Sequence, residues 1–312
     1  MKNTLPFKYR AFGLNIQSDF KIAEMLPAEF DREDVRIVMA ETPESIENPI
    51  REGVRFQLTN NEFLLKIDKV ARYYVADGSA IRIEKSNGST YQELRLFLLG
   101  VVFSALLHQR GMVPFHASAL KSSSEKGFLI CGRSGIGKST LTAYLLKQGY
   151  SLLSDDLSVV RPKEAEIWVY PSFPFLKLWK DVMEHLEFSA AEGIKLREPL
   201  EKFGYWLEES FYPDPVRVNT VFVLHAHNKE TYVNRELKGI EKFDELRYQT
   251  ARMQFMVDKY QSRHFGVVNQ LARSAKVIRI TRPQKPMDTE RLYEEIKKAS
   301  MLYTMPIHRF GS

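Results

Sequence analysis

The stretch from Gly127 to Thr140, GFLICGRSGIGKST, decides the fold of this chain. The run FLIC is apolar and predicts a buried strand, while a helix is expected from Lys138 to Gln148, with Gly149 as its cap. Between them, Gly132–Ser139 fits the pattern G-x-x-x-x-G-K-[ST]. A strand, a glycine-rich loop and a helix in that order are the context in which this pattern indicates the binding of nucleotide phosphates.

The pattern has a physical basis in the backbone of the loop. Glycines allow several N–H groups to converge on phosphate oxygens, and the amino end of the helix adds its positive dipole. Lys138 is expected to reach the β- and γ-phosphates, and the Ser139 hydroxyl to ligate Mg²⁺. The residues predicted around the nucleotide are Gly132, Arg133, Ser134, Gly135, Ile136, Gly137, Lys138, Ser139 and Thr140.

Two adjacent carboxylates, Asp155 and Asp156, follow the next predicted strand, SLLS. A helix of about ten residues returns the chain beside the first strand, so these carboxylates are expected at the same edge of the sheet as the phosphates. One of them would hold Mg²⁺ through water, and the other would accept a proton from an incoming hydroxyl. The alternative is that the pair merely caps a turn, because Asp is common at strand ends.

His116 is placed by strand register. If HASALK and GFLIC form a hairpin in which Lys121 pairs with Gly127, His116 faces Gly132 at the mouth of the loop. This position puts an imidazole near the γ-phosphate. A structural, hydrogen-bonded role is the alternative for a single histidine.

The rest of the chain predicts two modules. From Gly53 to Lys85, short alternating segments are separated by turn residues, which is typical of an antiparallel meander. Residues 1–97 are therefore expected to form a β-rich module, joined by a helix over Thr90–Arg110 to a module over 98–312. The strand–loop–helix–strand order predicts an α/β fold with a largely parallel sheet for the second module. Further strands are expected at 167–170, 220–224 and 276–280, helices at 177–186, 263–274 and 289–299, and a long excursion at 188–214.

Composition excludes several classes of protein. The 312 residues carry a net charge of +6 that is interleaved rather than clustered, which disfavours a dedicated nucleic-acid surface. The longest apolar stretch, about twelve residues from Leu96, is shorter than the roughly twenty that a membrane span needs. No export signal is visible, and the single Cys131 fits a reducing compartment, so a cytoplasmic protein without membrane contact is expected. Homo-oligomerisation is left open.

His116-Ala-Ser-Ala-Leu, GRSGIGKST and KQGYSLLSDDLSVV together resemble the catalytic domain of HPr kinase/phosphorylase, in the same order and at nearly the same spacing. The resemblance implies a P-loop kinase domain of the HPr kinase and phosphoenolpyruvate carboxykinase type, with ATP and Mg²⁺ as cofactors. It places His116 at the active-site histidine, Lys138 at the phosphate lysine, Ser139 at the magnesium hydroxyl and Asp156 at the proton acceptor. Asp155 is then the other metal ligand and the second choice for the acceptor.

The later family signature rich in Pro, Gly, Arg and Asn has no clear match, so the sequence leaves open whether phosphorolysis occurs. The N-terminal region and VYPSFPFLKLW look more like the HPr-kinase-related proteins of lasso-peptide biosynthesis, which phosphorylate the C-terminal serine of a precursor peptide. The expected function is therefore an ATP-dependent serine kinase with a peptide or small-protein acceptor. The alternatives are an HPr-type or metabolite kinase and a non-catalytic, nucleotide-dependent peptide-binding switch. Cations suggested for the acceptor carboxylate or the product phosphate are Lys177, Lys202, Arg279 and Arg282.

Overall fold

The computed structural model describes residues 5–123, 126–186, 188, 193–197, 200–285 and 287–300. Its first sheet has eight strands in the order β1-β2-β3-β8-β7-β6-β5-β4. They are β1 (Phe7–Ala11), β2 (Leu14–Ser18), β3 (Val35–Met39), β4 (Arg51–Gly53), β5 (Phe56–Leu58), β6 (Glu62–Ile67), β7 (Ala71–Ala76) and β8 (Ala80–Lys85). Strands β4 to β8 form the antiparallel meander that the sequence predicts.

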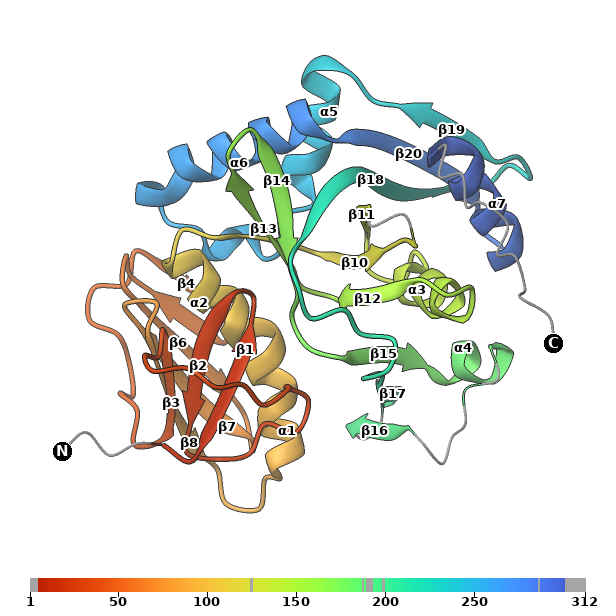
Figure 1. The fold of residues 1–312 in the computed structure, drawn as a ribbon. Coiled ribbons are helices and arrows are strands. Elements are labelled where there is room, and N and C mark those ends of the chain that lie inside the picture. The colour runs from red at the N-terminus through yellow and green to blue at the C-terminus, as the bar shows by residue number, and fades with distance from the viewer. Residues whose placement is uncertain are drawn as a thin grey trace.

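One long helical segment covers this sheet (Figure 1). It consists of α1 (Tyr91–Phe97), a π-helical segment (Leu98–Val102) and α2 (Phe103–Gln109). Thr90 and Glu93 form a capping box at its start, and Gly111, just beyond its end, has a φ of +63°. Its apolar residues pack in the same core as the inner face of β6 to β8. The predicted module boundary at 97/98 therefore falls inside a helix that packs on the first sheet on both sides of the boundary.

The second sheet has nine strands, with the order β12-β10-β11-β18-β14-β13-β9 and with β20 and β19 beside β18. The strands are β9 (Val113–Phe115), β10 (Ala117–Lys121), β11 (Gly127–Gly132), β12 (Ser151–Ser154), β13 (Ser158–Lys163), β14 (Glu166–Tyr170), β18 (Val216–His227), β19 (Val233–Glu236) and β20 (Lys276–Pro283). The helices are α3 (Lys138–Lys147), α5 (Gly239–Tyr248), α6 (Gln261–Ser274) and α7 (Thr289–Ser300).

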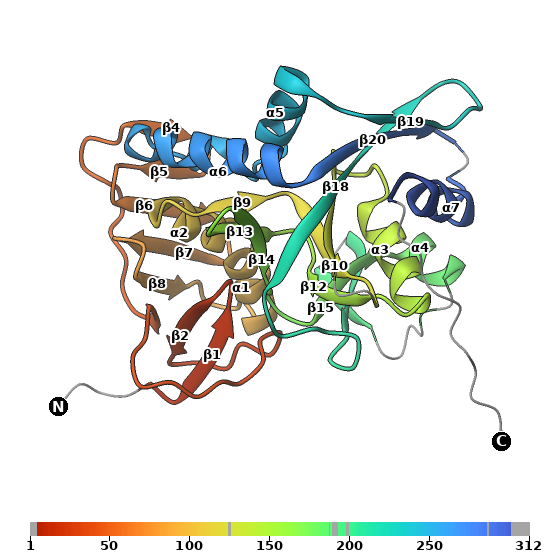
Figure 2. The same ribbon diagram turned by 45° about the horizontal axis from the view of Figure 1, so that its top comes forward.

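Helices cover both faces of this sheet (Figures 1 and 2). Phe128 and Ile130 of β11 share a core with α3 and α7, whereas Leu129 and Cys131 face the core that contains α5 and α6. Because both faces of β11 are buried, its residues are apolar without alternation. This explains why the run FLIC identified the strand.

The expectation of a largely parallel sheet is wrong. In this sheet the parallel pairs are β11 with β18 and β18 with β20. Strand β10 lies between β11 and β12 and is antiparallel to both. Strands β13, β14 and β9 also pair antiparallel. Since β12 is separated from β11 by one antiparallel strand, it still runs in the direction of β11. The residues that follow the two strands therefore lie at the same edge.

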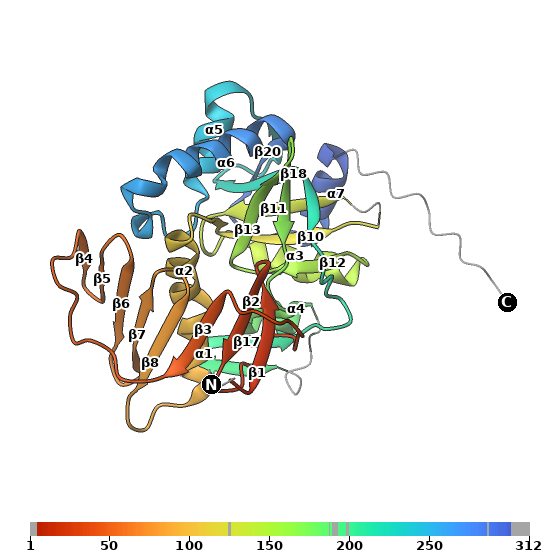
Figure 3. The same ribbon diagram turned by 60° about the vertical axis from the view of Figure 1, so that its left-hand side comes forward.

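A third sheet, β15-β17-β16, lies across α3 from the second one (Figures 1 and 3). It contains β15 (Phe175–Trp179), β16 (Ile194–Arg197) and β17 (Leu200–Trp206). The short helix α4 (Lys180–His185) follows β15 directly in the chain. The helix predicted over 177–186 is thus wrong at its start. Lys177 pairs with Gly204 in the sheet, and the Phe175 ring occupies the space that a side chain at Gly204 would need. Part of the excursion at 188–214 lies outside the described residues. No helix among the described residues is long and apolar enough to cross a membrane.

Candidate functional site

The glycine-rich loop, residues Gly132–Gly137, connects β11 to α3. Gly132 has a φ of +142°, and a Cβ there would lie 2.8 Å from the Leu224 carbonyl oxygen. Only glycine fits this position without displacing the backbone of β18. Gly137 has a φ of +103° and precedes the first turn of α3. The pattern of glycines in the sequence therefore reflects the backbone that the loop must adopt.

A hollow of about 470 Å³ lies over this loop, and we call it the loop hollow. It brings together His116, Lys138, Asp155, Asp156 and Lys202. Its other lining residues are Ser134, Gly135, Gly137, Ser139, Thr140, Trp179, Asp181, Val182, His185, Arg282, Gln284, Lys285, Met287 and Thr289. Most of the residues that the sequence singled out thus converge on one place, at the carboxyl ends of the central strands.

Lys138 is buried and folds back over the loop. Its Nζ donates to the carbonyl oxygens of Gly132 at 2.8 Å and Arg133 at 3.2 Å. It also lies 3.0 Å from Nε2 of His116. Burial lowers the pKa of the Lys138 ammonium, and the charges of Asp156 and Asp155 oppose that effect.

His116 lies between Lys138 and Asp156. The predicted register is confirmed, since Lys121 pairs with Gly127 and Ala117 with Cys131, which brings His116 level with Gly132. Its Nδ1 is 3.1 Å from the Asp156 carbonyl oxygen and 3.3 Å from the Asp156 Oδ1. Because the Lys138 ammonium has only protons to donate, we assign the lone pair of His116 to Nε2 and its proton to Nδ1. The imidazole then accepts from Lys138 and donates to Asp156.

The two carboxylates occupy different environments. Asp155 is buried, and its Oδ1 accepts from Ser118 at 2.7 Å while its Oδ2 accepts from the Lys177 backbone N–H at 3.3 Å. Burial raises the pKa of Asp155, and the neighbouring Asp156 charge adds to this. Asp156 has a φ of +67°, and its Oδ2 lies 3.7 Å from Nζ of Lys177. Burial acts to raise the pKa of Asp156 too, but the bond from His116 and the charge of Lys177 outweigh it and hold this pKa well below its usual range.

Of the four predicted acceptor cations, Lys177, Lys202 and Arg282 lie at the site and Arg279 does not. Lys177 forms an ion pair with Asp156, and Lys202 lines the loop hollow together with Asp156. Arg279 is not brought to the site, because it pairs with Glu241 at 3.0 Å and with Glu245. Arg282 is buried, and its Nη2 donates to the Ile136 carbonyl oxygen at 2.8 Å. Arg282 therefore fixes the backbone of the glycine-rich loop at Ile136.

Two residues near Asp156 were missed by sequence reasoning. Trp179 is 47% exposed and lines the loop hollow. Arg252 has a φ of +49°. Burial lowers the pKa of its guanidinium, and the negative charge of Asp156 opposes this only in part. Neither belongs to a recognisable pattern, and the only signal available for Trp179 was its place at the end of an apolar segment.

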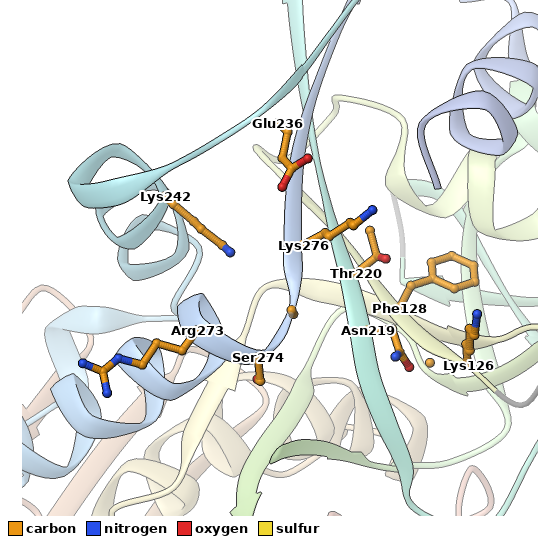
Figure 4. A pocket seen from close by; sticks show the side chains of 11 residues that line it. Lys126, Phe128, Asn219, Thr220, Glu236, Lys242, Arg273, Ser274 and Lys276 are labelled. Carbon is orange, nitrogen blue, oxygen red and sulfur yellow. The ribbon is translucent and has the colours of Figure 1, made fainter. Parts of the chain in front are cut away.

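A second hollow, of about 520 Å³, lies at the opposite edge of the sheet, at the amino ends of β11, β18 and β20 (Figure 4). Several lysines line it, but Figure 4 shows the side chains of Arg273 and Lys276 pointing away from each other. None of the site residues predicted from the sequence lines it. The loop hollow is therefore the candidate functional site, although it is slightly smaller.

The sequence matches no family model, and a search of curated proteins finds no significant match. Among solved structures, the chain is similar to the HPr(Ser) kinase/phosphatase from Coxiella burnetii, with 14% identity over 60% of this chain and 93% of that chain and a TM-score of 0.32. A similarity at this level does not establish a shared function, so the chemistry of the site rests on its own geometry.

Proposed function

We propose that this protein is an ATP- and Mg²⁺-dependent kinase that phosphorylates a serine hydroxyl on a peptide or small protein. The observation that carries this proposal is the continuous contact from Lys138 through His116 to Asp156 at the mouth of a glycine-rich loop. It provides a cation for phosphate oxygens on one side and an ionised carboxylate for an incoming hydroxyl on the other. Phosphoryl transfer requires this combination of positioning and electrostatics, with little covalent participation by the protein.

The loop backbone and Lys138 would bind the phosphates, with Arg282 keeping the Ile136 carbonyl in place. Asp156 would accept a hydrogen bond from the serine hydroxyl and then its proton, as the serine oxygen bonds to the γ-phosphorus and the bond to the ADP oxygen breaks. A carboxylate with a lowered pKa is a weak base, so its main contribution is to orient the hydroxyl. His116 holds Asp156 in that orientation.

The residues of the loop hollow fit Mg²⁺, which prefers hard oxygen ligands. Ser139 lines the hollow, and its hydroxyl makes no hydrogen bond to any described residue. Asp155 and Asp156 provide carboxylate oxygens at the same place. Ser139 and Asp155 are the proposed ligands, and the ion would neutralise charge on the phosphates.

The acceptor that we propose is the C-terminal serine of a lasso-peptide precursor, on the strength of the sequence resemblance, in a reducing cytoplasm that suits the free, buried Cys131. The test compares transfer from γ-labelled ATP to a peptide ending in serine and to HPr. Higher kcat/KM with the peptide supports this acceptor, whereas transfer to HPr alone would replace it with an HPr-type kinase. ATP binding without transfer to a wide set of acceptors would indicate the nucleotide-dependent switch.

A further inference from the structure

One wall of the loop hollow is made by the third sheet. Side chains alternate along a strand, so Lys177 and Trp179 of β15 point to the same side. Leu176 and Leu178 point to the other side, into the core against α3. Lys202 of β17 is directly opposite Trp179 in the register, and both line the hollow. The outer face of this sheet therefore presents Trp179 and Lys202 to the hollow and the Lys177 ammonium to Asp156.

This wall is fixed to the catalytic carboxylates. The backbone N–H of Lys177 donates to Oδ2 of Asp155, so the edge of β15 is tied to the residue beside Asp156. The Lys177 ammonium then lies 3.7 Å from Oδ2 of Asp156. A group bound on this wall is consequently held at a defined position relative to Asp156, the carboxylate that would accept the proton of the serine hydroxyl.

Lys202 has no ion-pair partner among the residues that the structure describes. Its Nζ lies 5.5 Å from the centroid of the Trp179 ring, and within the described ranges it has no hydrogen bond and no carboxylate within 4 Å. It lines the hollow together with Asp156 and Lys138, and its charge acts on both of them. The ammonium of Lys180, next along the chain from Trp179, instead pairs with Glu201 at 3.7 Å and does not line the hollow.

Trp179 is 47% exposed, and the Lys202 ammonium lies over its ring, so an aromatic surface and a cation are offered together in the hollow. The Trp179 Nε1 makes no hydrogen bond to any described residue, whereas the Trp206 Nε1, on the same sheet, donates to Glu208 at 3.2 Å. Tryptophan combined with a cation is a frequent recognition element for a ligand that has both a flat or apolar part and a negative charge.

We propose that Trp179 and Lys202 form the acceptor subsite, and that the acceptor carries a carboxylate close to its reacting hydroxyl. The chain segment next to the hydroxyl packs on the Trp179 indole, and the carboxylate pairs with Lys202, with Lys177 beside it. This inference rests on the proposed function, since it names the substrate class of the same site. A terminal serine supplies such a carboxylate from its own α-carboxyl group, and an internal serine supplies it from a neighbouring Asp or Glu side chain.

The test uses three peptides of otherwise identical sequence: one ending in serine with a free carboxylate, its C-terminal amide, and an amide with Asp next to the serine. Lys202→Gln should lower kcat/KM about 10- to 100-fold for the acceptors that carry the carboxylate, as expected for the loss of a charge-assisted hydrogen bond. It should change the plain amide less than threefold and leave the KM for ATP unchanged. Lys180→Gln, which removes a charge from the adjacent helix, should change none of these values. Preference for the free acid identifies the α-carboxylate as the source, and preference for the Asp peptide identifies a side chain.

Trp179→Leu should raise KM for all three peptides with little effect on kcat. Trp179→Phe, which retains an aromatic ring, should restore most of the binding. The proposal is overturned if Lys202→Gln weakens acid and amide peptides equally, or if its effect lies in the KM for ATP.

The subsite can also be tested without turnover, by titrating the acid and amide peptides into the protein saturated with Mg·ADP and following tryptophan fluorescence. If no peptide is phosphorylated but the acid peptide binds more tightly than the amide in a Lys202-dependent manner, the kinase function is wrong and the subsite stands. If transfer occurs and Lys202→Gln has no effect on either peptide, the kinase function stands and the subsite is wrong.

Discussion

Replacing Asp156 with Asn should abolish most of the transfer while leaving the fold intact. Asn keeps an oxygen that can accept the bond from the Nδ1–H of His116, which lies 3.3 Å from Oδ1. Its amide nitrogen would then face the Lys177 ammonium and offer only protons, so the serine hydroxyl loses its acceptor. Loss of the group that orients the attacking hydroxyl can cost about 100-fold, and loss of the proton acceptor adds to it, so we expect kcat to fall at least about 100-fold, equivalent to about 2.7 kcal/mol.

Stability should respond differently. Asp156 has a φ of +67°, a conformation that Asn tolerates well, and its side chain is 41% exposed. The ion pair joins this partly exposed carboxylate to the buried Lys177 ammonium, so the loss of its charge should lower the free energy of unfolding by about 1 kcal/mol, which is too little to unfold the protein. Steady-state kinetics with a saturating peptide and thermal denaturation measure the two effects separately.

Asp155→Asn is the matched comparison. Asp155 is buried, and its two oxygens accept from Ser118 and from the Lys177 N–H. An amide retains only one acceptor oxygen there, so Ser118 must turn and lose its acceptor, at a cost of about 1 kcal/mol in stability. If Asp156→Asn keeps kcat within tenfold of the wild type, Asp156 neither orients the serine hydroxyl nor accepts its proton. If Asp155→Asn shows the larger loss of kcat without a loss of stability, the roles of the two residues must be exchanged.

Three further predictions concern the loop and the core. Lys138→Ala should reduce kcat/KM for ATP on the order of 100-fold, since it removes the cation at the phosphates, and unchanged kinetics would place the active site elsewhere. Arg282→Met keeps an unbranched apolar stem but removes the bond to the Ile136 carbonyl, so the Kd for ATP, measured by calorimetry, should rise about tenfold; an unaltered Kd would show that the loop does not depend on this contact. Burial lowers the pKa of His108 from 6.5 to about 4, against the bond to the Ala251 carbonyl. The unfolded chain then binds this proton first, so stability should fall as the pH drops from 6.5 towards 4, by up to about 3 kcal/mol. His108→Gln should flatten that part of a denaturation series, and the same slope in the variant would refute the assignment.

The elements nearest the glycine-rich loop were predictable because their signals are local. The loop needs glycine where its backbone meets the Leu224 carbonyl, and the register of β10 with β11 follows from a short hairpin. His116 could be placed from that register alone. Asp155 and Asp156 could be placed because the helix between the strands sets which edge of the sheet they reach.

The wall opposite the loop was not predictable in the same way. Phe175–Trp179 carries no helix or strand signal strong enough to decide between the two, and its pairing with β17 depends on Gly204, almost thirty residues away. Arg279 was a reasonable acceptor cation by sequence, but its place on β20 brings it to Glu241 and Glu245 of α5. Contacts between distant segments decide both cases, and no spacing within one segment encodes them.

The proposed kinase function is tested most directly by a single-turnover experiment with excess protein, γ-labelled ATP, Mg²⁺ and a peptide that ends in serine. We predict that the label moves to the serine oxygen of the peptide with wild-type protein, and that Asp156→Asn binds the same nucleotide but transfers the label at least about 100-fold more slowly. If the wild-type protein binds ATP and the label stays on the nucleotide or appears only as free phosphate, with this peptide and with HPr alike, the protein is not the kinase that we propose.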